Sequence, residues 1–136
     1  MNAIEASWSI YMVSHDICKM QMKTQGAKQV LELVKNIKFD VIVQDLTNGQ
    51  CFYGLREIAK GNPPLVGFTP FGSPNWVKDM VGGNNWPAIK QFPLYHHTAP
   101  FTLWEKTLNF IYYEIDDIVR QYYYLPVQQE IAENYI

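Results

Sequence analysis

Asp45 is the residue of this sequence best placed to take part in chemistry. It follows an apolar, β-branched run at residues 39–44 and precedes turn-forming residues at 47–49. In open α/β sheets, ligands bind outside the carboxyl ends of the strands, where a carboxylate can orient a histidine, hold a metal ion or accept a phosphoryl group. The alternative is an aspartate that caps a helix or closes a turn, and position alone favours this alternative. For Asp40, at the opposite end of the run, the structural interpretation is favoured more strongly.

The histidines and cysteines give weaker chemical signals. His96 and His97 are adjacent, and neighbouring residues of an extended segment point in opposite directions, so we do not expect them to share a metal ion. His15 lies in a predicted helix, and we expect neither catalysis nor metal binding from it. Cys18 and Cys51 are the only cysteines. Because C-x-x-C and H-E-x-x-H motifs are absent, we expect two buried, apolar thiols and no metal site.

Apolar residues at helical spacing predict long helices at both ends of the chain. Residues 7–38 are predicted to be helical, with a break or kink at Gly26. A T-x-x-E capping box at residues 102–105 predicts a long helix that runs to about residue 123. The apolar face of that helix is expected to comprise Leu103, Leu108, Ile111, Ile115, Ile118 and Tyr122. Pro126 then occupies the first position of a further predicted helix.

A strand–helix–strand unit lies between these helices. Residues 39–45 and 65–69 are predicted strands, and residues 50–60 are a predicted helix. Such units form parallel sheets with right-handed crossovers, so the expected fold class is α/β. Residues 70–100 are irregular apart from a short predicted helix near 75–81, and long loops of this kind are often functional.

Composition limits the class of protein. The chain has 136 residues, of which 48% are hydrophobic and 18% charged, with a formal net charge of −2. These values suit one globular domain and exclude disorder, collagen and coiled coil. The absence of a basic excess argues against a nucleic-acid binder. No apolar run reaches about 18 residues, so no transmembrane helix is expected, and no secretory signal follows Met1. These features alone predict a cytosolic protein.

Several short motifs follow one another along the chain from residue 38 onward. They are KFDVIVQD at 38–45, PLVG at 64–67, FG at 71–72, W-x-x-D-x-V-G at 76–82, FTLWE at 101–105 and YYLP at 123–126. Their types, order and spacing resemble those of the animal UDP-glycosyltransferase family, in particular its insect branch. The resemblance covers nearly the whole chain and is firmest over residues 38–136.

The resemblance implies two stacked Rossmann-like domains, the first binding the acceptor and the second the UDP-sugar. Residues 1–136 are then expected to be a partial acceptor-binding (N-terminal) domain: a fragment of a Rossmann-like parallel sheet with a long C-terminal helical segment. The family's signal peptide, first strand with the catalytic histidine, H-G-G donor domain and membrane anchor have no counterpart here. The family also implies the lumenal side of the endoplasmic reticulum membrane, with membrane association only through the missing segments.

The resemblance also implies a reaction. The family transfers sugar from a UDP-sugar to a small lipophilic acceptor with inversion, and UDP-sugar is a co-substrate, so no cofactor or metal is expected. A histidine removes the proton of the acceptor hydroxyl, and an aspartate, matched here by Asp45, holds that histidine in its tautomer. Phe71, Trp76 and Trp86 are expected in the acceptor pocket or on a membrane-facing surface. The chain alone is expected to be inactive, and a homo-oligomer is compatible with this interpretation.

Two other functions stay open. The chain is alternatively a non-catalytic binding or regulatory protein derived from the same family, and the sequence does not separate this from an enzyme fragment. Residues 41–46 also resemble the phosphoacceptor strand of a response-regulator receiver. That fold needs an acidic pair after an earlier strand, which this chain lacks. We further expect an open sheet edge and uncovered apolar helix faces, which promote association.

Overall fold

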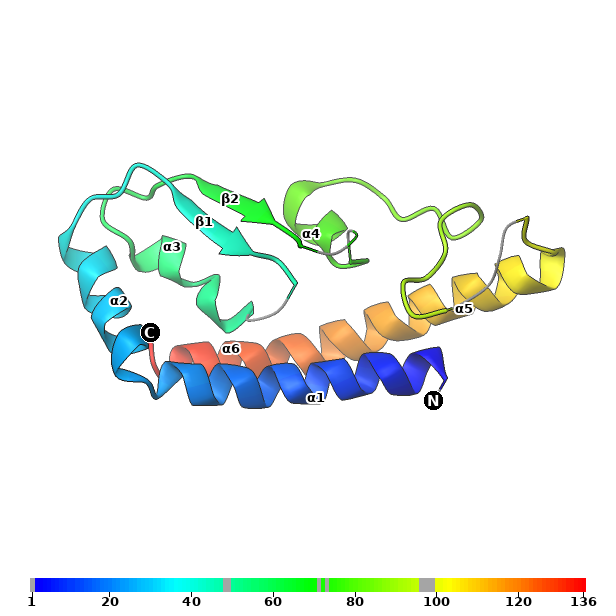
Figure 1. Cartoon of the computed structure of the whole chain (residues 1–136), viewed down its shortest axis with the longest axis horizontal. Coiled ribbons are helices and arrows are strands. Elements are labelled where there is room, and N and C mark those ends of the chain that lie inside the picture. Colours follow the sequence, from blue (N-terminus) through cyan, green and yellow to red (C-terminus); the bar gives the residue numbers. More distant parts are fainter. Residues whose placement is uncertain (1, 48–49, 71, 73, 96–99) are drawn as a thin grey trace.

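Long helices form one layer of the molecule, and a small parallel sheet with short helices lies along one side of it (Figure 1). A computed structural model of the chain describes residues 2–47, 50–70, 72, 74–95 and 100–136. The elements are α1 (Ala3–Met22), α2 (Gln25–Asn36), β1 (Ile42–Asp45), η1 (Gln50–Phe52), α3 (Leu55–Ile58), β2 (Leu65–Phe68), α4 (Val77–Val81), α5 (Leu103–Val119), η2 (Arg120–Tyr124) and α6 (Leu125–Glu133).

Both N-terminal helices begin on side-chain caps. At the start of α1, Asn2 Oδ1 accepts the Glu5 N–H at 2.9 Å, and Glu5 Oε2 accepts the Asn2 N–H at 2.9 Å. Thr24 Oγ1 accepts the Ala27 N–H at 3.2 Å and so starts α2. The break predicted at Gly26 is therefore misplaced. It falls before Thr24, because this side chain satisfies an amide that a helix start leaves without a partner, and Gly26 lies inside α2.

The sheet has two parallel strands among the residues that the structure describes. Ile42 lies opposite Leu65 and Asp45 lies opposite Phe68. The expected mixture of helix and strand, with parallel pairing, is confirmed at this level. Both strands are shorter than predicted. None of their side chains is buried: Val43, Val66 and Phe68 are exposed, and the other side chains are half-buried.

The connection between the strands differs from the single helix predicted at 50–60. It consists of η1, a 3-10 turn, and the short helix α3, separated at Tyr53 and Gly54. In β2, Gly67 has a steric role, because a Cβ at this position would overlap the side chain of buried Leu46. Glycine therefore lets the chain that leaves β1 pack directly against β2.

Helix α5 continues through η2 into α6 as one long rod (Figure 1). The predicted capping box is present at its start. The further helix predicted at Pro126 is present as α6, with Pro126 in its first turn, but it follows η2 without a break. Proline lacks an N–H and its ring clashes with the carbonyl four residues earlier. The η2 segment is a π turn in which the Leu125 N–H donates to the Arg120 carbonyl, and this wider turn lets the rod pass Pro126 without ending.

Cys18 and Cys51 form a disulfide, so the expectation of two free thiols is wrong. Their Cα atoms are 6.3 Å apart although the residues are separated by 33 positions in the sequence. Helix α1 and η1 both pack against α6, which brings the two cysteines together. Met22 and Ile131 complete this buried cluster. Sequence spacing alone could not show this proximity.

The apolar face predicted for α5 is not its buried face. Leu103 is 82% exposed and Ile118 is 56% exposed. The buried residues of α5 are instead Asn109, Tyr113 and Asp116. The physical reason lies in the partners of this helix, which offer backbone carbonyls and polar side chains that satisfy a polar face.

Candidate functional site

Asp45 is the last residue of β1, and its carboxylate closes a turn. Its Oδ1 accepts the Thr47 N–H at 2.8 Å. Among the residues that the structure describes, this is the one hydrogen bond of the side chain, so Oδ2 has capacity for a further donor. Asp45 lies at the end of the strand, as predicted. Its contact with Thr47 is the one expected if Asp45 serves to close a turn.

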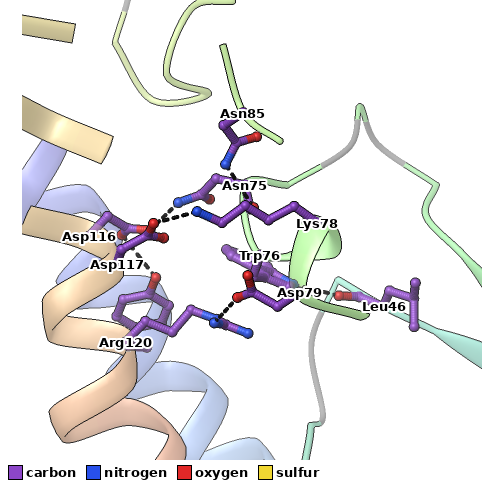
Figure 2. Close-up of polar contacts among 10 residues, drawn as sticks. Leu46, Asn75, Trp76, Lys78, Asp79, Asn85, Asp116, Asp117 and Arg120 are labelled. Atoms are coloured by element: carbon purple, nitrogen blue, oxygen red, sulfur yellow. Dashed lines mark hydrogen bonds and ion pairs between the residues drawn. The ribbon is translucent and has the colours of Figure 1, made fainter. Parts of the chain in front are cut away.

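Trp76 directly precedes α4 and connects it to the end of β1. Its indole Nε1–H donates to the Leu46 carbonyl at 2.8 Å, a contact that Figure 2 shows. The ring also lies near Tyr11 of α1, with 6.3 Å between the ring centroids. Trp76 is thereby fixed beside the residue that follows Asp45.

A pocket of about 540 Å³ opens next to Trp76. Tyr11 lines it from α1, Thr47 from the segment after β1, and Phe92 and Leu94 from the loop before α5. Pockets for small organic ligands usually measure roughly 300–1,000 Å³ and are mostly apolar. Size and lining therefore suit a small, largely apolar molecule.

Asp45 lines a different and more open groove, of about 600 Å³. Ile17 of α1 and Val30 of α2 form one side of this groove, and β1 with Phe52 and Asp45 forms the other. Trp76 thus contacts Leu46, the residue that follows Asp45. The side chains of Asp45 and Trp76 nevertheless line two separate hollows of the surface.

The other predicted acceptor-binding residues lie elsewhere. Trp86 is 63% exposed and is not among the residues that line the pocket beside Trp76. Its carbonyl accepts the N–H groups of Ile89, at 2.9 Å, and Lys90, at 2.7 Å. Phe71 falls outside the described residues, as do His96 and His97.

A largely buried polar cluster, drawn in Figure 2, adjoins the pocket, because Tyr11 and Asn75 belong to both. Asp116 of α5 accepts hydrogen bonds from the Tyr11 hydroxyl, at 2.9 Å, and from Asn75 Nδ2. Asn85 Nδ2 donates to the Asn75 carbonyl at 3.0 Å. Burial raises the pKa of Asp116, although the donors from Asn75, Tyr11 and Ser7 oppose this shift. Burial, together with the neighbouring Asp116 charge, also raises the pKa of Tyr11.

Two ion pairs join α4 to the rod formed by α5 and η2 (Figure 2). Arg120 Nη1 lies 2.5 Å from Asp79 Oδ2, and Lys78 Nζ lies 2.5 Å from Asp117 Oδ2. The Arg120 side chain is only 5% exposed. These contacts hold α4, and with it Trp76, at the wall of the pocket.

Sequence reasoning missed this polar cluster, although a signal was present. Asn109, Tyr113, Asp116 and Arg120 follow one another at helical spacing, and this spacing places them on one face. A polar stripe on a helix whose other face is apolar is usually the side that faces solvent. The pattern alone therefore predicted the wrong face of α5 as the buried one.

No described histidine contacts Asp45. His15 is buried on α1, its Nε2 lies 3.3 Å from the Tyr124 carbonyl, and its ring stacks on Tyr124 with centroids 5.0 Å apart. Burial lowers the pKa of His15. Within the described ranges, no three His, Cys, Asp or Glu residues gather in a way that could hold a metal ion.

Comparison with known proteins gives no relative. No family model matches the chain, and no curated protein or solved structure matches it either. In the part of the chain that the structure describes, no helix has the length and apolar character needed to cross a bilayer. The family resemblance therefore depends on the motifs of the sequence itself.

Proposed function

We propose that this chain is part of the acceptor-binding domain of a UDP-glycosyltransferase that transfers sugar to a small lipophilic acceptor. The observation that carries the proposal is the arrangement at the carboxyl end of β1. There Asp45 ends a parallel strand, and Trp76, fixed to the next residue by its indole N–H, forms a wall of an apolar pocket. Both residues belong to motifs that resemble the family.

The exposure of the sheet supports a larger Rossmann-like sheet. Val43 is 63% exposed and Val66 is 51% exposed. Parallel sheets normally have both faces covered, and their strands are rich in aliphatic residues for that reason. We therefore infer that β1 and β2 are neighbouring strands of a sheet that has further strands and helices in the complete enzyme.

The proposed role of Asp45 is to orient a base. An acceptor hydroxyl attacks the anomeric carbon of the UDP-sugar while a histidine removes its proton. A carboxylate beside that histidine fixes its tautomer and stabilises its charged form. Asp45 has an oxygen available for this contact among the described residues. The histidine and the UDP-sugar site would come from other segments of the complete enzyme, so the 136-residue chain is expected to transfer no sugar.

Disulfide formation supports a location on the lumenal side of the endoplasmic reticulum membrane. Disulfides form and persist in oxidising compartments and are rare in the cytosol. Cys18 and Cys51 are paired and buried. This pairing favours an oxidising compartment such as the lumen over the cytosol.

Ligand binding by the chain itself tests the pocket. We expect 1-naphthol, a small lipophilic hydroxyl compound, to bind and to quench tryptophan fluorescence. Trp76→Ala should weaken binding about tenfold or more, as loss of an aromatic wall does. Trp86→Ala is the matched control and should leave binding, measured by calorimetry, unchanged. Equal effects of both substitutions would place the ligand elsewhere.

Turnover of the complete enzyme tests Asp45. In a version that contains this sequence together with a donor-binding domain, Asp45→Asn should lower kcat on the order of 10³-fold or more, as loss of the orienting carboxylate does in related triads. Affinity for the UDP-sugar should change little. Near-normal turnover would assign Asp45 to the turn with Thr47 and to no catalytic role.

A non-catalytic binding protein is the second candidate. The observation that favours it is that no described histidine contacts Asp45, whereas the apolar pocket beside Trp76 is formed within this chain. Binding of 1-naphthol to the chain, combined with no detectable sugar transfer by a version that also contains a donor-binding domain, would favour this second function.

A further inference from the structure

The pocket beside Trp76 has a polar corner. Tyr11 of α1 and Asn75, which precedes α4, both line the pocket. Both also donate to the buried carboxylate of Asp116, the Tyr11 hydroxyl to Oδ1 at 2.9 Å and Asn75 Nδ2 to Oδ2. Asp116 itself is not among the residues that line this pocket. The carboxylate therefore acts on the pocket through the side chains of Tyr11 and Asn75.

The carboxylate of Asp116 depends on neutral donors. In the part of the chain that the structure describes, the two nearby cations are engaged elsewhere, Arg120 with Asp79 and Lys78 with Asp117. A buried carboxylate without a cation beside it needs hydrogen-bond donors in order to stay charged. Turning the Tyr11 hydroxyl away would leave one carboxylate oxygen buried and without this donor, which is costly. The proton of Tyr11 is therefore held on Asp116.

This arrangement fixes what Tyr11 can offer to a ligand. A tyrosine hydroxyl has one proton, and its oxygen accepts further hydrogen bonds. Because the proton is directed to Asp116, the oxygen can only accept from a molecule in the pocket. Hydrogen bonds in a chain polarise one another, so donation to a carboxylate makes this oxygen a stronger acceptor. Thr47 also lines the pocket, but its hydroxyl has no partner among the described residues, so it can donate or accept.

We propose that Tyr11 is a specificity-determining residue of this pocket, which selects aromatic ligands that carry an O–H or N–H donor over ligands of similar shape that lack one. Asp116 is a positioning residue, because it acts on the ligand through the Tyr11 hydroxyl. The proposal rests on the proposed function, since it takes this pocket as the acceptor-binding site. Neither residue belongs to the motifs that resemble the family.

Calorimetry of the wild-type chain at neutral pH tests the selection without any substitution. 1-Naphthol and 1-naphthylamine carry a donor, whereas 1-fluoronaphthalene and 1-methoxynaphthalene carry none. We expect the Kd of each donor compound to be about tenfold lower, which corresponds to one hydrogen bond. The fluoro compound controls for size, and the methoxy compound shows whether an acceptor oxygen can replace the donor. Equal Kd values for all of these compounds would overturn the proposal.

Substitutions separate the roles of Tyr11 and Asp116. Tyr11→Phe removes the acceptor oxygen and should lower the Kd ratio of 1-fluoronaphthalene to 1-naphthol from about 10 to about 1. Asp116→Leu frees the Tyr11 proton, so 1-methoxynaphthalene should gain affinity relative to 1-fluoronaphthalene. In Asp116→Asn the amide oxygen still accepts that proton, and the wild-type ratio should return in part. Tyr53→Phe is the matched control, because it removes a buried hydroxyl oxygen outside the pocket lining.

The ratio of Kd values separates selectivity from stability. A smaller folded fraction weakens the binding of every ligand by the same factor and leaves the ratio unchanged, and near-UV circular dichroism checks that each variant is folded. An unchanged ratio in folded Tyr11→Phe would overturn the proposal while leaving the pocket of the proposed function in place. If none of these compounds binds the wild-type chain, the pocket assignment of the proposed function is wrong, and the selection is wrong with it.

Discussion

Two buried regions of this molecule are stabilised by opposite means. At the end of α1 near α2, Cys18 and Met22 pack with Cys51 and Ile131 in an apolar cluster closed by a disulfide. Near the middle of α1, Tyr11 meets a cluster of carboxylates, amides and a guanidinium from α4 and the residues beside it, from α5 and from η2. We call them the disulfide region and the polar region. Both lie along the same helix.

The difference assigns different tasks to the two regions. Apolar packing and a covalent bond do not depend on pH or on an exact set of partners, so the disulfide region supplies stability. A buried polar cluster stabilises little beyond an apolar core, but it is strongly destabilised when one partner is lost. The polar region therefore fixes one arrangement of α4 against α5, and this arrangement sets the pocket beside Trp76.

Removal of the disulfide should have the largest effect. Cys18 and Cys51 close a loop across 33 positions, and opening a loop of this length lowers the free energy of unfolding by about 3–4 kcal/mol in the chain-entropy account. Cys18→Ala/Cys51→Ala should show this loss in urea unfolding. The two sulfur-bearing residues are 0% and 1% exposed, so the native chain should resist reductant until it unfolds. An unchanged unfolding midpoint would show that packing alone stabilises this region.

Loss of Asp79 should have an intermediate effect. Asp79→Ala leaves the buried Arg120 guanidinium without its carboxylate, which we expect to lower the free energy of unfolding by about 2–3 kcal/mol. Lys78→Ala is the matched control, because Lys78 and Asp117 are both partly exposed and such pairs contribute about 0–1 kcal/mol. The same urea titration measures both variants. Equal losses would remove the distinction between a buried and a superficial pair.

The pH dependence of the polar region should give the smallest effect. The pKa of Asp116 is raised above the ordinary carboxyl value of 3.8 by burial. Such a group contributes stability that is fully present below the unfolded pKa and is lost as pH rises through the folded pKa. Asp116→Asn should therefore gain stability relative to the wild type as pH rises from 3.8, with the difference constant once the folded pKa is passed. A difference independent of pH would show that Asp116 is not perturbed.

Local sequence signals predicted the elements better than their packing. The T-x-x-E box before α5, the β-branched run at β1 and the short helix at α4 were all recognisable, because each depends on neighbours in the chain. The burial of Asn109 and Asp116 was not, since it depends on carbonyls at Pro87 and Lys90 and on the Tyr11 hydroxyl. A helix pattern shows that two faces differ, but it does not show which face has a partner.

The candidate site was predictable to a similar extent. The strand-end position of Asp45 follows from the local pattern, and Trp76 belongs to a motif that the sequence displays. The contact of Trp76 with Leu46, and the tethering of α4 by Arg120, depend on how distant segments meet. The Cys18–Cys51 pair is a further example, because a bond between residues on two separate elements leaves no trace in local spacing.

The π turn at Arg120–Tyr124 has a consequence for how the rod keeps its alignment. A helix repeats every 3.6 residues, so a stripe of buried positions drifts around the axis as the helix lengthens. One residue more per turn resets this drift. After the π turn, Gln128 and Ile131 of α6 are buried along the same helix α1 that Tyr113 and Asp116 of α5 approach. The turn acts as a phase correction, which lets one continuous rod present an inward side along the whole of its partner.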